Sequence, residues 1–245
     1  MGKKLLPIIG RSIEMNQLNN EKLNVATGFN RIFRAYNFKD AQLDWALIAR
    51  QLEPNLEETK AYSELSENLI RYTLADTSGK FDVDGALCLL GTQGVGKTLA
   101  FRTLHEFNKL FRNRFYLNGM ETNFNFTIYS ALEMVSDYNR GGFNALEKYI
   151  NRSVICIDDL GTEPLESVYF GAKVNVLEKV IELRYMKNKV THISTNLPPK
   201  VLKQAYGERV FSRLKGRSYF YFVENEDFRL KQSRKRQKIS AKEMG

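Results

Sequence analysis

The feature of the chain that most limits its fold is a glycine-rich pattern, G-x-x-x-x-G-K-T, at Gly91–Thr98. An apolar run typical of a buried strand, Ala86–Leu90, comes before it, and a helical pattern, Lys97–Phe111, begins within it. Strand, glycine loop and helix in this order form a cradle for phosphate, because the glycines let backbone N–H groups converge and the start of the helix attracts anions. The pattern predicts a nucleotide-binding loop.

Two side chains of this pattern have expected roles of their own. Lys97 would bring a positive charge to the β- and γ-phosphates, and the Thr98 hydroxyl would ligate Mg²⁺. The pattern alone fits either ATP or GTP. The residues expected to contact the nucleotide are Gly91, Thr92, Gln93, Gly94, Val95, Gly96, Lys97, Thr98 and Leu99.

From Asp84 onward, strand-like and helix-like segments alternate, which predicts an α/β fold with a parallel sheet covered by helices on both faces. The expected strands are Ala86–Leu90, Phe124–Tyr129, Val154–Asp158, Val190–Thr195 and Tyr219–Val223. The expected helices are Lys97–Phe111, Ala131–Tyr138, Phe143–Ile150, Phe170–Met186 and Pro199–Ala205. Ligands bind such sheets outside the carboxyl ends of the strands, where the glycine loop lies.

Two adjacent carboxylates, Asp158 and Asp159, end one of the expected strands. A buried strand has no reason to end in two acids unless a cation lies nearby. Asp158 is therefore expected to hold the Mg²⁺ shell, and Asp159 to orient or deprotonate an attacking water.

An amide and two guanidinium groups complete the set of candidate residues. Asn196 follows the strand Val190–Thr195, where its amide could touch the γ-phosphate or its water, or simply cap a turn. Arg209 and Arg213 lie four residues apart and so share one helical face. A planar, always charged guanidinium suits a γ-phosphate and can act from a neighbouring subunit. The alternative is a basic helix that faces solvent or a nucleic-acid backbone.

Most of the net charge of +9 lies at the C-terminal end. Residues 229–245 contain seven lysines and arginines against one glutamate, a net charge of +6. This tail fits either a solvated terminus or a salt-sensitive contact with the phosphate backbone of a nucleic acid.

Composition favours a globular protein of a reducing compartment. The 245 residues are 43% hydrophobic, enough for one α/β domain and a smaller appendage. Cys88 and Cys156 lie in apolar runs without zinc or disulfide spacing, so we expect both in the core. No stretch approaches membrane-spanning length and the start of the chain lacks the pattern of a signal peptide, which predicts a cytoplasmic protein with no membrane partner.

The first eighty residues lack strand alternation and contain two helical patterns, Ala41–Leu52 and Leu56–Leu74. Trp45, in the first of these, is expected to pack in the core. A short polar hinge, Thr77–Lys80, separates this region from the alternating segments.

Together, the motifs between Asp84 and Arg229 resemble the AAA+ ATPases of the DnaC/DnaI helicase-loader group and the related IstB transposition helpers. The most specific segments are Ile157–Glu163, Ser194–Pro198 and Glu208–Leu214. The resemblance implies a P-loop NTPase fold of the AAA+ type, a three-layer αβα sandwich with five parallel strands and no C-terminal lid. It implies Walker A at Gly91–Thr98, Walker B at Asp158 and Asp159, sensor 1 at Asn196 and an arginine finger at Arg213 rather than Arg209.

The same resemblance implies a function in DNA replication. An Mg²⁺-dependent ATPase of this group would load a replicative ring helicase onto single-stranded DNA and self-associate through Arg213. The expected organisation is a helical partner-binding region at residues 1–80, an ATPase core at residues 81–228 and a basic tail at residues 229–245.

Two other functions fit the same residues. An IstB-like helper would assemble on duplex DNA and recruit a transposase. An ATP-gated DNA-binding switch with little turnover also stays open, because the Asp159 side chain is about one methylene shorter than the glutamate that many motor-like ATPases carry there.

Overall fold

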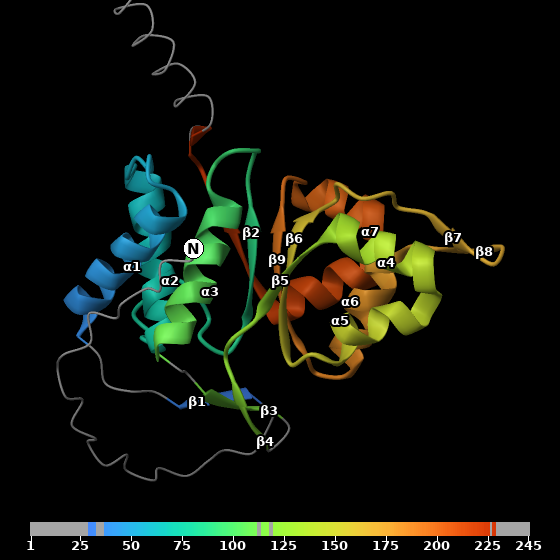
Figure 1. Cartoon of the computed structure of the whole chain (residues 1–245), viewed down its shortest axis with the longest axis horizontal. Helices are drawn as coiled ribbons and strands as arrows, with labels where there is room; N and C mark the ends of the chain where they lie inside the picture. Colours follow the sequence, from blue (N-terminus) through green and yellow to red (C-terminus); the bar gives the residue numbers. More distant parts are fainter. Residues whose placement is uncertain (1–28, 33–36, 112–113, 118–119, 226, 229–245) are drawn as a thin grey trace, which may run out of the picture.

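The computed structural model describes residues 29–32, 37–111, 114–117, 120–225 and 227–228. Its centre is a five-stranded sheet with the strand order β10-β2-β9-β6-β5 (Figure 1), and every neighbouring pair runs parallel. The strands are β2 (Ala86–Leu90), β5 (Thr127–Ser130), β6 (Val154–Leu160), β9 (Val190–Thr195) and β10 (Ser218–Phe222). The predicted five-stranded parallel sheet is confirmed.

The strand bounds follow the apolar runs closely, and the differences at β5 and β6 are informative. β2 and β9 span the predicted residues, whereas β6 continues to Leu160 and β5 begins only at Thr127. Phe124 and Phe126 precede β5 and are buried outside the sheet. Their apolar character therefore reflects side-chain packing and not strand pairing.

Helices cover both faces of the sheet. They are α3 (Lys97–Phe111), α4 (Ala131–Gly141), the 3₁₀ turn η1 (Gly142–Leu146), α5 (Glu147–Asn151), α6 (Val176–Met186) and α7 (Pro199–Arg217). Alternate residues of β2 enter two different cores. Leu87 and Leu89 pack with α3, and Cys88 and Leu90 pack with α4, α6 and α7. The fold is the predicted three-layer αβα sandwich, and both cysteines are core residues, as expected.

The two helices that precede the sheet belong to the first of these cores. They are α1 (Phe38–Leu52), capped by Asn37, and α2 (Lys60–Leu74), capped by Thr59. The Trp45 ring meets the Phe107 ring of α3 edge to face, with centroids 5.3 Å apart. The described part of residues 1–80 thus packs directly against the helix that follows the glycine loop.

A small antiparallel sheet was not expected from the sequence. It consists of β1 (Phe29–Ile32), β3 (Arg114–Leu117) and β4 (Met120–Asn123), with β3 in the middle. Strand β1 lies in the region for which only helices were predicted, and its partner is more than eighty residues away along the chain. Such long-range pairing leaves no local periodicity to read.

The predicted helix Phe170–Met186 is wrong over its first six residues. A hairpin of β7 (Ser167–Tyr169) and β8 (Ala172–Val174) occupies this stretch, and α6 begins at Val176. Phe170 and Gly171 both have positive φ, at 47° and 80°, which makes the two-residue turn, and Asn175 caps the shortened helix. None of the described helices is long and apolar enough to cross a membrane, and the basic tail at residues 229–245 lies outside the described residues.

Candidate nucleotide-binding site

The loop between β2 and α3 has the backbone that its glycines predict. Gly91, Gly94 and Gly96 have φ values of 151°, 80° and 99°, a region that residues with side chains rarely adopt. A Cβ atom on Gly91 would also lie 2.7 Å from the carbonyl oxygen of Val223. The loop leads directly into the N-terminus of α3 at Lys97, the setting in which backbone N–H groups bind phosphate.

The Lys97 ammonium group is buried and donates hydrogen bonds to three oxygen atoms, each at 2.7 Å. Two are the carbonyl oxygens of Gly91 and Thr92, within the loop itself. The third is Oδ1 of Asn196, directly after β9. The structure therefore brings together the lysine and the amide that the sequence assigns to the γ-phosphate.

A second contact joins the start of α3 to the end of β6. The Thr98 hydroxyl donates a 3.0 Å hydrogen bond to Asp158 Oδ1, and the Ser194 hydroxyl donates to the same oxygen. A hydroxyl beside a carboxylate offers the oxygen ligands that Mg²⁺ takes together with phosphate and water. Within the described part of the chain, no three His, Cys, Asp or Glu side chains gather as metal ligands. The oxygens of Thr98 and Asp158 thus fit Mg²⁺ shared with a nucleotide.

Asp159 lies at an irregularity in β6. The pairing of β6 with β9 shifts register between Ile157 and Leu160, and Asp159 has a φ of +56°. Its N–H donates to Ser194 Oγ at 2.9 Å, and its carbonyl oxygen accepts from the Thr162 hydroxyl at 2.9 Å. A bulge of this kind redirects a side chain at the end of a strand and is common next to active sites.

Ser194 therefore contacts both acidic residues, a role that the sequence did not predict. It is fully buried on β9, donates to Asp158 and accepts from the Asp159 N–H. Serine is common enough in strands to carry no signal alone. The sequence feature that could have pointed to this role is the position of Ser194 in a predicted buried strand, two residues before Asn196.

Glu163 is a second residue to which no role was assigned from the sequence. Its carboxylate is buried, accepts the Gly161 N–H at 2.8 Å and also accepts the Tyr206 hydroxyl. Burial and this acidic neighbour raise the pKa of Tyr206 above its usual value. A Cβ on Gly161 would lie 2.3 Å from a methyl carbon of Leu197. These contacts fix the loop after the acidic pair against the chain that follows Asn196.

Arg213 is held by its own chain, away from the glycine loop. On α7, its guanidinium donates to Glu182 of α6 at 2.9 Å and lies 5.0 Å from the centre of the Tyr185 ring. The Arg209 side chain is 74% exposed and also approaches Glu182, at 3.5 Å. Both arginines thus meet one glutamate, and their placement on one helical face is confirmed.

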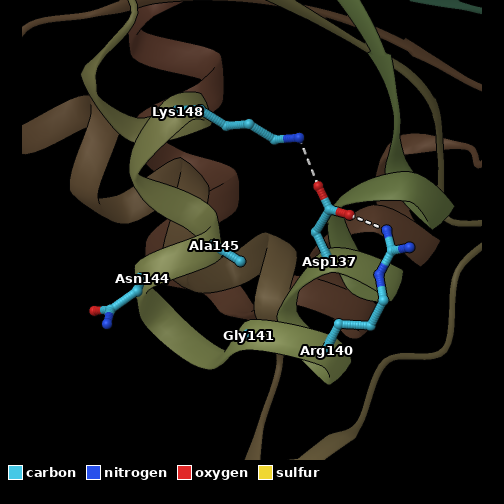
Figure 2. A pocket seen from close by; sticks show the side chains of 6 residues that line it. All are labelled: Asp137, Arg140, Gly141, Asn144, Ala145 and Lys148. Atoms are coloured by element: carbon cyan, nitrogen blue, oxygen red, sulfur yellow. Dashed lines mark hydrogen bonds and ion pairs between the residues drawn. The ribbon is translucent and has the colours of Figure 1, made fainter.

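A surface pocket lies apart from the glycine loop, between α4, η1 and α5 (Figure 2). Its centre is Asp137, which pairs with Lys148 at 2.7 Å and with Arg140. The hydrogen bond from Lys148, with those from Tyr149 and Arg140, lowers the pKa of Asp137 to about 2. None of the predicted site residues lines this pocket, and both of its cations are already paired.

Comparison with solved structures supports the fold, whereas comparison of sequences finds no related family. No family model and no curated protein sequence matches the chain. The crystal structure of the DnaC helicase loader aligns with a TM-score of 0.51 and 17% identity, covering 71% of this chain and 96% of that one. A candidate primosome component from Streptococcus pyogenes serotype M3 aligns with a TM-score of 0.50 and 15% identity, covering 71% and 86%. The structure of DnaI gives 0.48 and 17%, covering 74% and 92%.

The predicted structural similarity to helicase loaders is therefore confirmed. At these identities the similarity is one of fold: the chain has an α/β fold with a five-stranded parallel sheet, similar to that of the DnaC helicase loader.

Proposed function

We propose that this chain binds ATP with Mg²⁺, hydrolyses it and acts as a DnaC/DnaI-like loader that places a replicative ring helicase on single-stranded DNA. Two contacts carry the nucleotide part of the proposal: Lys97 to Asn196 at 2.7 Å and Thr98 to Asp158 at 3.0 Å. The first joins the start of α3 to the end of β9, and the second joins it to the end of β6. A triphosphate bound in the loop would thus contact the Lys97 ammonium group, the Asn196 amide and a metal ion held by Thr98 and Asp158.

Each side chain has a separate task in this proposal. Lys97 binds the phosphates, and Asn196 orients the γ-phosphate or the attacking water. Thr98 and Asp158 would hold Mg²⁺, which supplies positive charge where the transferred phosphoryl group gains negative charge. Asp159 accepts a hydrogen bond or a proton from the water. Ser194 of β9 holds the end of β6, which carries both aspartates.

In this proposal the chain self-associates, and Arg213 acts at the active site of a neighbouring subunit. Its side chain is 15% exposed and paired with Glu182, so it is ordered before any neighbouring subunit binds. A guanidinium positioned in this way can leave the glutamate for the γ-phosphate of an adjacent protomer, which carries more negative charge. The active unit would then be an oligomer with sites shared between subunits.

The decisive experiment measures ATP hydrolysis by the full chain with and without single-stranded DNA, and its co-elution with the replicative ring helicase of the same organism. Stimulation by single strands and ATP-dependent co-elution support the loader. Stimulation by duplex DNA and co-elution with a transposase instead support the IstB-like helper. Absence of ATP binding overturns the proposal altogether.

A second candidate, an ATP-gated DNA-binding switch with little turnover, is favoured by Asp159. The Asp159 side chain is short, and its backbone is held in the left-handed region. Its carboxylate therefore has little freedom to move toward the attacking water. Replacing Asp159 with Glu separates the two functions. Turnover that rises at least tenfold in D159E, with ATP affinity unchanged, supports the switch, whereas turnover that falls supports an ATPase adapted to aspartate.

A further inference from the structure

The chain that follows β10 returns to the glycine loop and contacts it at Gly94 and Gly96. Figure 1 shows this last described segment beside the turn that joins β2 to α3. The Phe228 N–H donates a 3.1 Å hydrogen bond to the Gly94 carbonyl oxygen. We call the residues Asn225, Asp227 and Phe228 the strap.

The strap packs so closely on the loop that only glycine fits beneath it. A Cβ atom on Gly96 would lie 2.9 Å from Cε2 of Phe228, and one on Gly94 would lie 2.1 Å from Oδ1 of Asp227. These two glycines therefore have a second requirement besides their positive φ values. They admit an aromatic ring and a carboxylate at the surface of the loop.

A second aromatic ring reaches the same place from α2. Tyr62 meets Phe228 edge to face, with centroids 6.0 Å apart and planes at 81°, and its Cδ2 lies 3.5 Å from the Cβ position of Gly96. The pKa of Tyr62 is raised to about 12 by burial, so the ring stays neutral. Two uncharged rings from distant parts of the chain thus flank Gly96.

Two further polar contacts hold this arrangement in place. The Val223 N–H donates to the Leu90 carbonyl oxygen at 2.7 Å, which continues the pairing of β10 with β2. The Thr59 hydroxyl, at the start of α2, donates to Asn225 Oδ1 at 3.0 Å. Because the same α2 supplies Tyr62, the two rings are tied to one scaffold.

We infer that Phe228, backed by Tyr62, is the stacking surface for the base of the nucleotide, an inference that rests on the function proposed above. The loop holds phosphates through its N–H groups, so the sugar and base must extend past the residues that flank it. The uncharged Phe228 ring lies against Gly96, and a nucleotide base can stack on such an aromatic ring. The Asp227 carboxylate repels phosphate from the outer side of Gly94 and accepts hydrogen bonds from an amino or hydroxyl group.

The test compares two ligands, Mg-ATP and inorganic tripolyphosphate with Mg²⁺, by calorimetry on the full chain. Only ATP has a base, so a stacking residue affects ATP alone. We expect F228A to weaken ATP binding about tenfold and to leave tripolyphosphate binding within about twofold. F228W should restore ATP binding, and its fluorescence should change with ATP and not with tripolyphosphate. F222A is the control, since Phe222 is 51% exposed on β10.

Three outcomes would overturn the inference. Tighter binding of both ligands by F228A would show that the strap obstructs the loop. Equal weakening of both would show that Phe228 only shapes the loop, and unchanged ATP binding would show that the base lies elsewhere. Binding of neither ligand by the wild-type chain would instead refute the proposed function itself. Thermal unfolding of each variant establishes that it is folded.

Discussion

The Lys97 ammonium group donates a 2.7 Å hydrogen bond to Oδ1 of Asn196, across ninety-nine residues of sequence. Lys97 begins α3 after strand β2, and Asn196 follows the adjacent strand β9. Since parallel strands end at the same edge of the sheet, the two groups meet without any loop having to fold over. Asp158, in β6, lies at the same edge of the sheet. The order of the strands in the sheet therefore brings the residues of the candidate site together.

Replacement of Lys97 by Ala tests the centre of this site. The loop loses its buried cation, and three oxygen atoms lose a shared donor. We expect ATP affinity to fall about a hundredfold, or hydrolysis to be lost, because charge-assisted contacts to phosphate are strong. Calorimetry and a phosphate-release assay measure both. K109A is the matched control, because Lys109 is a half-exposed lysine near the other end of α3. Full activity of K97A would end the assignment.

Replacement of Arg213 by Ala separates binding from turnover. The residue contacts Glu182 and Tyr185 in its own chain, not the loop, so ATP affinity should stay within about twofold. Turnover should fall about a thousandfold, the usual effect of losing an arginine finger. R209A, which changes the more exposed arginine on the same face, should retain turnover. An R213A protein that assembles and hydrolyses ATP normally would exclude the finger.

Replacement of Ser194 by Ala tests the contact that joins the two aspartates. Asp158 loses a hydroxyl donor, and the Asp159 N–H loses its acceptor. We expect kcat to fall about tenfold with little change in KM, because a positioning residue affects the reacting geometry more than ground-state binding. S212A, a change of an exposed serine on α7, serves as the control. A change in KM alone would contradict this role.

Replacement of Arg184 by Met tests the stability of the core on the α6 face. This arginine is fully buried and donates to Thr191 and to the carbonyl oxygens of Tyr149, Arg152 and Val190. Burial lowers its pKa to about 9. The variant removes one buried donor from each of these carbonyl groups, at a cost of about 3–5 kcal/mol in unfolding free energy. Urea denaturation measures the loss, and K187A, on the exposed end of α6, should differ from wild type by less than about 0.5 kcal/mol.

Replacement of Asp137 by Asn gives a pH signature. The pKa of Asp137 is about 2 in the folded chain and about 3.9 in an unfolded one. A lowered pKa contributes stability above pH 4 that is lost as the pH falls toward 2. D137N should therefore be about 1 kcal/mol less stable than wild type at pH 7, with the difference closing between pH 4 and 2. E166Q, which removes an exposed ion pair, should show no such closure. A pH-independent difference would contradict the ion-pair origin.

Sequence patterns predicted the sheet well because each central strand is buried on both faces and therefore reads as an apolar run. Ala86–Leu90 and Val190–Thr195 needed no tertiary information. The hairpin at Ser167–Val174 was missed because its turn residues are Phe170 and Gly171, and a bulky residue at positive φ is not a turn signal. Strand β1 was missed because its partner, β3, is more than eighty residues away along the chain. Strands β3 and β4 are local partners, since Leu117 pairs with Met120, and this hairpin was not recognised from the sequence.

The sequence by itself determined the glycine loop and the five strands of the central sheet, and it named Lys97, Thr98, Asp158 and Asn196 as candidate site residues. These follow from local chemistry: backbone freedom at glycine, apolar periodicity, and polar groups at strand ends. Only the tertiary structure decided that Ser194 joins the two aspartates, that Glu182 holds Arg213, and that the strap covers Gly94 and Gly96. Each of these contacts joins segments that are distant in the chain. Strand order and helix packing bring them together, and neither is written in any local pattern.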